Sequence, residues 1–144
     1  MNKEIKIFLV EDNEGDIVLT KQAFKKAKMA NQINVAKDGI EALSYLRKEG
    51  LFQNAETPDL ILLDINLPRK NGLKVLAEIK NDDGLRSIPV MIMTTSDSEK
   101  DITDSYYNHA NCYIVKPVDF KNFMNVVQTI RDFFSLVKLP SHKA

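Results

Sequence analysis

The sequence lacks several features that would point to whole classes of protein. Cys112 is the only cysteine among 144 residues, so the chain has no intrachain disulfide and no cysteine-based zinc site. Its 20 basic and 20 acidic residues balance, so no net field favours nucleic acid or an anionic membrane. No apolar run approaches the roughly 20 residues of a membrane span, and the charged start lacks the apolar stretch of a signal peptide. We therefore expect a cytoplasmic protein that binds neither nucleic acid directly nor membranes.

We expect the chain to form one domain. No internal repeat, linker or low-complexity segment divides it, and 144 residues are enough to bury roughly two thirds of the extended-chain surface. The predicted domain spans residues 1–144, with its folded core at about 4–138 and a frayed tail over Pro140–Ala144.

Four short apolar runs each end on a polar or charged side chain. The central run, Leu60–Leu63, has no alternation of apolar and polar residues, so we expect a parallel strand with helices covering both faces. Asp64 follows it directly. The other runs are Ile7–Val10 before Glu11 and Asp12, Val90–Met93 before Thr94, and Tyr113–Val115 before Lys116. Because ligands bind beyond the carboxyl ends of the strands in open α/β sheets, these polar residues mark the expected site.

Helical patterns alternate with these strands. Ile33–Ala36 is a weaker, alternating run that we expect at a sheet edge, and Gly50–Pro58 is expected to be a polar loop. The predicted helices run from a cap at Asn13 to about Met29, from Asp38 with Ile40, Leu43 and Leu46 facing inward, over Leu73–Asn81 and Ser98–Asn108, and from a cap at Asp119 to about Val137. This order predicts an α/β fold with five parallel strands and helices on both faces of the sheet.

Two of the predicted helices differ from ordinary amphipathic ones. Ser98–Asn108 is strongly polar with Ile102 as its main aliphatic anchor, so we expect it to be the least firmly held. We expect Tyr106 and Tyr107 in ordinary helix packing, and an interface role for them ranks second. The final helix has an apolar stripe wider than one core face. The residues alone favour equally a helix packed deeply in its own domain and an exposed patch that pairs with another chain.

Glu11, Asp12 and Asp64 converge at one end of the sheet if the first and third strands are neighbours. Three carboxylates this close repel one another, so one of them needs a raised pKa or the group needs a cation. Oxygen ligands of this kind suit Mg²⁺. Lys116 adds a positive charge and Thr94 a hydroxyl, so the set suits transfer of a phosphoryl group to Asp64.

With these residues in place, the sequence closely resembles the receiver domain of two-component response regulators, over nearly the whole chain. Any one matching segment alone would be weak, but six occur in the family's order and spacing. They are Leu9–Asn13, Asp38–Leu43, Leu62–Pro68, Asn71–Leu73, Ile88–Thr94 and Tyr113–Pro117. The resemblance implies a flavodoxin-like, doubly wound five-stranded parallel sheet of order 2-1-3-4-5 with five helices.

The resemblance also implies roles for the acidic residues. Asp64 is the expected phosphoacceptor, and Glu11 and Asp12 are the expected acidic pair around Mg²⁺. Asn66 is expected to bind the metal through its backbone carbonyl. One position departs from the family pattern, because Thr95 stands where Ala, Gly or Ser is usual; the larger side chain would slow entry of water or phosphodonor.

By the same resemblance, phosphorylation switches a surface of the protein. Thr94 is the switch hydroxyl, Tyr113 the switch aromatic and Lys116 the phosphate-contacting lysine, with a cis bond to Pro117. The implied protein is a stand-alone response regulator and not an enzyme. It takes a phosphoryl group from a sensor histidine kinase and changes partner binding or dimerisation at its fourth helix, fifth strand and fifth helix. Three features are similar to those of small regulators that partner bacterial phytochrome-type kinases: the Glu14–Asp16 segment, the extended loop before Asp59 and the Phe133–Pro140 tail.

Two other functions compete with this interpretation. A haloacid-dehalogenase-like phosphatase also uses an aspartyl nucleophile, but it carries a second Asp two residues later, where this chain has Asn66, and the chain offers no cap domain. A receiver-like interaction module that works without phosphorylation would lack the acceptor, the acidic pair or the lysine. All of these residues are present, so the interaction module ranks second.

Overall fold

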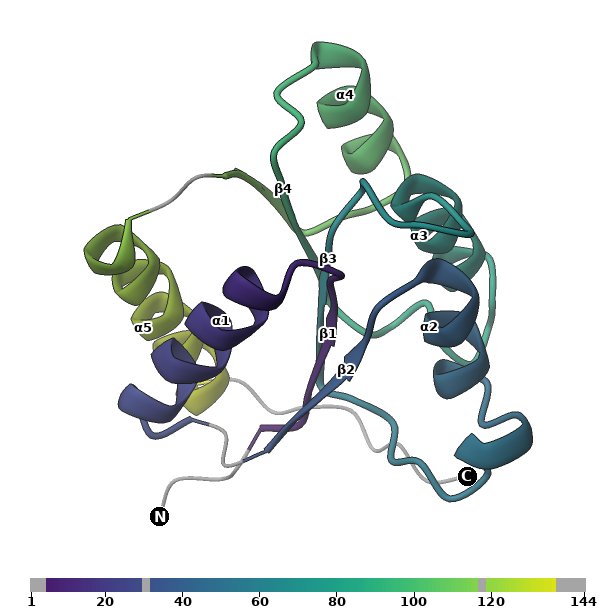
Figure 1. The fold of residues 1–144 in the computed structure, drawn as a ribbon, viewed down its shortest axis with the longest axis horizontal. Coiled ribbons are helices and arrows are strands. Elements are labelled where there is room, and N and C mark those ends of the chain that lie inside the picture. The colour runs from purple at the N-terminus through teal and green to yellow at the C-terminus, as the bar shows by residue number, and fades with distance from the viewer. Residues whose placement is uncertain (1–4, 30–31, 117–118, 137–144) are drawn as a thin grey trace.

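Five short parallel strands form the centre of the computed structural model, which describes residues 5–29, 32–116 and 119–136 (Figure 1). The strands are β1 (Ile7–Val10), β2 (Ile33–Ala36), β3 (Leu60–Leu63), β4 (Val90–Thr94) and β5 (Cys112–Val115). The helices are α1 (Glu14–Lys26), α2 (Gly39–Leu46), α3 (Gly72–Lys80), α4 (Glu99–Tyr107) and α5 (Phe120–Leu136), with a short 3-10 helix, η1, at Gly50–Phe52. The sheet order β2-β1-β3-β4-β5 confirms the predicted topology and places the weak strand β2 at an edge.

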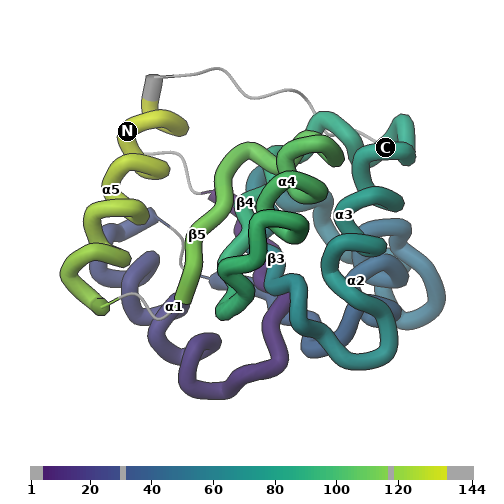
Figure 2. Tube along the Cα trace, turned by 90° about the horizontal axis from the view of Figure 1, so that it is seen from above, coloured from purple at the N-terminus to yellow at the C-terminus, as the bar shows by residue number. Residues whose placement is uncertain are grey.

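Helices cover both faces of the sheet, as the unbroken apolar strands predict. Successive side chains of a strand point to opposite faces, so each strand contributes to two cores. Leu60 and Leu62 of β3 pack with α1 and α5, whereas Ile61 and Leu63 pack with α2 and α3. Figures 1 and 2 show α1 and α5 together on one side of the sheet, with α2 and α3 on the other.

The strand register brings the ends of β1 and β3 together. Val10 pairs with Leu63, so Glu11 and Asp64, the next residues of each strand, leave the sheet side by side. The Asp64 amide donates to the Val10 carbonyl at 3.0 Å. On the other side, the Lys116 amide donates to the Thr94 carbonyl at 2.7 Å. Glu11, Asp64, Thr94 and Lys116 therefore all lie at the carboxyl ends of the strands.

Capping residues start the helices where the sequence predicts them. Side chains of Asn13, Asp38 and Ser98 each accept a hydrogen bond from the backbone N–H three residues later. Asp119 does the same for the Asn122 amide at 2.8 Å, which confirms the predicted start of the final helix. Two other predictions fall outside the described residues: the end of that helix at about Val137 and the cis bond to Pro117.

Three local predictions were wrong. The segment expected to be a polar loop contains η1. Ile40 is exposed, because α2 buries a face that begins one residue earlier, at Gly39, and continues through Ala42, Leu43 and Leu46. Tyr106 and Tyr107 do not pack in the core: Tyr107 is 82% exposed.

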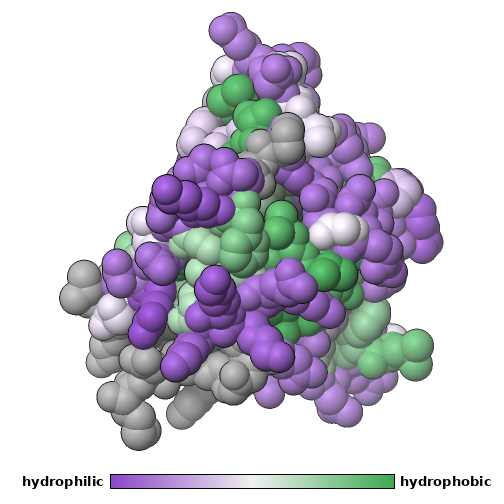
Figure 3. Space-filling model, turned by 60° about the vertical axis from the view of Figure 1, so that its left-hand side comes forward, coloured by the Kyte–Doolittle hydropathy of each residue, from purple (hydrophilic) through white to green (hydrophobic). Residues whose placement is uncertain are grey.

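The outer surface is polar with some exposed apolar groups. Figure 3 shows one side of the molecule, where hydrophobic residues gather around the centre of the view and hydrophilic residues surround them. On α5, Phe123, Val127 and Ile130 are buried in the core, whereas Phe133 is 55% exposed. The wide stripe therefore serves both the core and the surface. Among the described helices, none is long and apolar enough to cross a membrane.

Candidate functional site

Three carboxylates meet at the carboxyl ends of β1 and β3, as the sequence predicts. Glu11, Asp12 and Asp64 each offer one oxygen, and these oxygens all lie within 4.8 Å of one another. Glu11 and Asp64 are buried, whereas Asp12 is exposed. A group of carboxylate oxygens with one side open to water is a donor set that suits a hard divalent cation keeping several of its waters.

Crowding and burial change how Glu11 titrates. Burial raises the pKa of Glu11 from 4.5 to about 7; its hydrogen bond to Lys116 opposes this shift, and the charge of Asp64 adds to it. The free site therefore holds more negative charge than its surroundings stabilise. A divalent cation would relieve this repulsion, so the residues present fit the metal that the sequence analysis predicts.

Lys116 brings a positive charge into this group from the end of β5. Its ammonium pairs with Glu11 Oε1, with Asp16 Oδ2 at 2.8 Å and with Asp64 Oδ2 at 3.5 Å. Burial alone would lower the pKa of Lys116, but its hydrogen bonds to Asp16 and Glu11 and the charge of Asp64 raise that pKa overall. The lysine therefore stays protonated beside Asp64.

Asp16 is the site residue that the sequence analysis missed. No sequence pattern assigns Asp16 to the site, whereas the structure places it against Lys116, 100 residues away along the chain. The available signal is its position in the first turn of the helix that follows Glu11 and Asp12. Its partner depends on how α1 and β5 pack in space, which no local pattern contains.

Asn66, in the loop after β3, links Asp64 to Thr94, the last residue of β4. The Asn66 amide N–H donates to Asp64 Oδ1 at 3.1 Å. The Asn66 side-chain Nδ2 donates to Thr94 Oγ1 at 3.4 Å and to Thr95 Oγ1 at 3.3 Å. Thr94 is fully buried, and its hydroxyl is connected to Asp64 through Asn66.

A chain of hydrogen bonds connects Thr94 to Tyr113 and to α4. Thr94 Oγ1 accepts from the Ser96 amide at 3.4 Å, and the Tyr113 hydroxyl donates to the Ser96 carbonyl at 2.9 Å. The Ser96 hydroxyl donates to Asp101 Oδ2, in the first turn of α4, at 2.6 Å. A movement of Thr94 would therefore be transmitted through Ser96 to both Tyr113 and α4.

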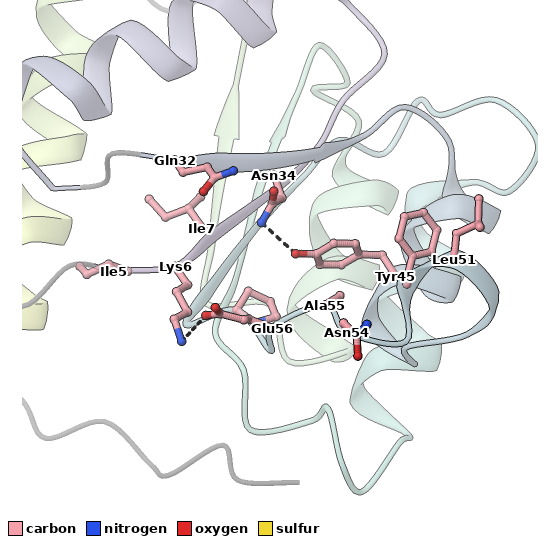
Figure 4. Close-up of a pocket in the computed structure, with 12 residues that line it drawn as sticks. Ile5, Lys6, Ile7, Gln32, Asn34, Tyr45, Leu51, Asn54, Ala55 and Glu56 are labelled. Carbon is pink, nitrogen blue, oxygen red and sulfur yellow. Dashed lines mark hydrogen bonds and ion pairs between the residues drawn. The ribbon is translucent and has the colours of Figure 1, made fainter.

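A separate cavity of about 580 Å³ lies at the other end of the sheet (Figure 4). It is lined by the start of β1, by Asn34 of β2, by Tyr45 of α2 and by the η1 region. Tyr45 stacks on Phe8 with ring centroids 4.2 Å apart and accepts a hydrogen bond from Asn34 at 2.9 Å. None of the residues around Asp64 lines this cavity, so the two features are independent.

Comparisons with known proteins agree with this geometry. Residues 7–128 match the family model of the response regulator receiver domain. The chain is 40% identical to response regulator Rcp1 of Synechocystis sp. over 136 residues, which cover 94% of this chain and 92% of Rcp1. Among solved structures, it is similar to the phosphorylated cyanobacterial phytochrome response regulator RcpA, with a TM-score of 0.88, 47% identity and coverage of 96% of this chain and 100% of RcpA.

The Mn²⁺-bound form of Rcp1 is also similar, with a TM-score of 0.85, 40% identity and coverage of 95% of this chain and 99% of Rcp1. The match to the family model spans most of the chain and includes every residue of the site described above. The sheet order and the five helices agree with the flavodoxin-like receiver fold. This chain belongs to the response regulator receiver domain family.

Proposed function

We propose that Asp64 accepts a phosphoryl group from the phosphohistidine of a sensor histidine kinase. The observation that carries this proposal is the position of Asp64: it is 7% exposed at the end of β3, with the Lys116 ammonium 3.5 Å from one carboxylate oxygen and two further carboxylates beside it. A nucleophile next to a fixed cation and a set of metal ligands is the arrangement that phosphoryl transfer requires.

In the proposed reaction, an Asp64 carboxylate oxygen attacks phosphorus. The new P–O bond forms as the P–N bond of the phosphohistidine breaks, and the leaving imidazole keeps the electron pair and takes up a proton from water. Lys116 stabilises negative charge on the phosphoryl oxygens, and the Thr94 hydroxyl donates a hydrogen bond to one of them. Glu11, Asp12 and Asp64, with the Asn66 backbone carbonyl, would hold Mg²⁺, which supplies further neutralisation of phosphoryl charge.

The proposal extends to a switch at the surface formed by α4, β5 and α5. Thr94 now accepts hydrogen bonds from the Asn66 side chain and the Ser96 amide. Turning the Thr94 hydroxyl toward a phosphoryl group changes the loop at Ser96, which is hydrogen-bonded to Tyr113 of β5 and to Asp101 of α4. The population then shifts toward a form that binds a partner or dimerises through this surface.

A phytochrome-type histidine kinase in the cytoplasm is the proposed phosphodonor. The similarity to RcpA supports this choice, since RcpA is a cyanobacterial phytochrome response regulator. The competing function is an interaction module that works without phosphorylation. The complete set of Asp64, Lys116 and the acidic pair favours the phosphorylated switch.

Intact-protein mass spectrometry after incubation with acetyl phosphate tests this proposal. We expect wild type to gain one phosphoryl group in the presence of Mg²⁺ and not in its absence. Asp64→Asn should gain none, whereas Asp83→Asn, which removes an exposed carboxylate from the loop after α3, should behave as wild type. Labelling of Asp64→Asn at the wild-type rate would refute the role of Asp64, and no labelling of any form would favour the interaction module.

A further inference from the structure

We propose that Asp16 is a positioning residue that holds the Lys116 ammonium in place for phosphoryl transfer. This inference rests on the proposed function of Asp64. The Lys116 side chain is only 8% exposed, and its ammonium has three carboxylate partners, of which Asp16 is bonded at 2.8 Å. An ammonium group has three N–H donors, so these partners account for all of them.

Asp16 reaches the site only through Lys116. It is not one of the three carboxylates whose oxygens gather within 4.8 Å, and its side chain is 34% exposed. Its backbone is fixed at both polar groups: the amide donates to Asn13 Oδ1 at 2.9 Å, and the carbonyl accepts from the Thr20 hydroxyl at 2.7 Å. The first turn of α1 therefore presents the Asp16 carboxylate to Lys116 from a well-defined position.

The three contacts of the ammonium are unequal. Those to Glu11 and Asp16 are close, whereas the contact to Asp64 is 3.5 Å, which is long for a charge-assisted hydrogen bond. Asp16 thus keeps the cation beside Asp64 without letting it form a tight pair with the attacking carboxylate. The third N–H remains directed toward the acceptor, where charge accumulates when a phosphoryl group arrives.

Loss of the Asp16 charge has a defined consequence. The ammonium is then free to move toward Asp64 and pair with it closely, which makes the carboxylate a weaker nucleophile and leaves the donor less well oriented. We expect Asp16→Asn to lower the initial rate of phosphoryl acceptance from acetyl phosphate by roughly tenfold, less than removal of a group that itself contacts the reacting atoms.

Glu14 provides a matched control on the same turn of α1. It pairs with Lys37 at the surface, where both side chains are more than half exposed, and it does not contact Lys116. Glu14→Gln therefore removes the same charge from the same helix start. We expect the rate of phosphoryl acceptance by Glu14→Gln to stay within about twofold of wild type, because an exposed carboxylate at the start of a helix stabilises that helix only slightly.

A second measurement reports on Lys116 without any phosphodonor. In wild type, the buried and fully bonded ammonium should give a resolved ¹⁵N–¹H nuclear magnetic resonance signal, because its protons exchange slowly with water. That signal should broaden or disappear in Asp16→Asn and persist in Glu14→Gln. Thermal unfolding of the three proteins shows whether a lower rate or a lost signal comes from a less stable fold.

The outcomes separate this inference from the proposed function. If wild type accepts a phosphoryl group and Asp16→Asn accepts it at the same rate or faster, the positioning role is refuted while the role of Asp64 stands. A Lys116 signal unchanged in Asp16→Asn would refute it equally. A wild-type protein that accepts no phosphoryl group would overturn both.

Discussion

Replacing Gly72 by Ala should displace the acceptor and destabilise the fold. Gly72 begins α3, and its amide donates to the Ile65 carbonyl at 2.8 Å, so the helix start lies directly against the end of β3. A Cβ at this position would lie 2.1 Å from the Asp64 carbonyl oxygen and 2.7 Å from Ile65 Cα. Both contacts are to backbone atoms, which no rotation of a side chain can relieve.

The size of the effect follows from these distances. Real Cβ atoms essentially never approach another atom more closely than 3.0 Å, so the backbone must move by roughly 0.9 Å to relieve the 2.1 Å contact. Overpacking of this kind costs about 2 kcal/mol of unfolding free energy. Because the atom that must move belongs to Asp64, the rate of phosphoryl acceptance should fall as well.

Gly84→Ala is the matched control for this change. A Cβ there has its nearest neighbour, Asp82 Oδ1, at 3.4 Å, which is an ordinary contact. We expect Gly84→Ala to leave stability unchanged or to raise it by up to about 1 kcal/mol through the lower entropy of the unfolded chain. Urea unfolding of wild type and both variants measures the difference. A Gly72→Ala protein as stable as Gly84→Ala would refute the close packing of α3 against Asp64.

Two further predictions concern charge and the surface of α5. Without metal, the pKa of Glu11 is raised from 4.5 to about 7, so between these pH values the folded state keeps a proton that the unfolded chain loses. As the pH rises from 4.5 to 7, wild type should therefore lose about 1–3 kcal/mol of stability relative to Glu11→Gln, with no further change above pH 7. Urea unfolding at pH 5 and 8 measures this, added Mg²⁺ should remove the loss, and a relative gain by wild type would contradict it. On α5, Phe133→Lys should weaken the proposed phosphorylation-dependent self-association by at least about tenfold, since Phe133 is exposed and apolar. Size-exclusion chromatography of the phosphorylated proteins measures the association, and unchanged dimerisation would exclude Phe133 from the interface.

The sequence was enough to predict the strands, their order along the chain and the carboxylates that follow β1 and β3. Leu60–Leu63 is buried on both sides, and the pairing of Val10 with Leu63 brings Glu11 and Asp64 together as predicted. The burial of the run and the position of Asp64 at its end follow from local patterns, because the run and the residue that ends it are adjacent in the sequence, whereas the meeting of Glu11 and Asp64 also requires β1 to lie beside β3. The sheet order came from family resemblance, since periodicity does not determine which strands are neighbours.

The errors arose where tertiary packing decides the outcome. Whether Ile40 is buried depends on the rotation of α2 against the sheet. The buried face of α2 begins one residue earlier, at Gly39, so Ile40 is exposed. The exposure of Tyr107 depended on how much of α4 the neighbouring elements cover. The contact of Asp16 with Lys116 joins residues 100 positions apart, so only the packed structure reveals it.

The most direct test of the central claim is to locate the phosphoryl group on the chain. Wild type phosphorylated with acetyl phosphate and Mg²⁺ would be treated with borohydride, which reduces an aspartyl phosphate to homoserine, and then digested for tandem mass spectrometry. We predict homoserine at position 64 alone, and none without Mg²⁺. Homoserine at another carboxylate position, such as 11, 12 or 16, or at no position, would contradict the assignment of Asp64 as the phosphoacceptor.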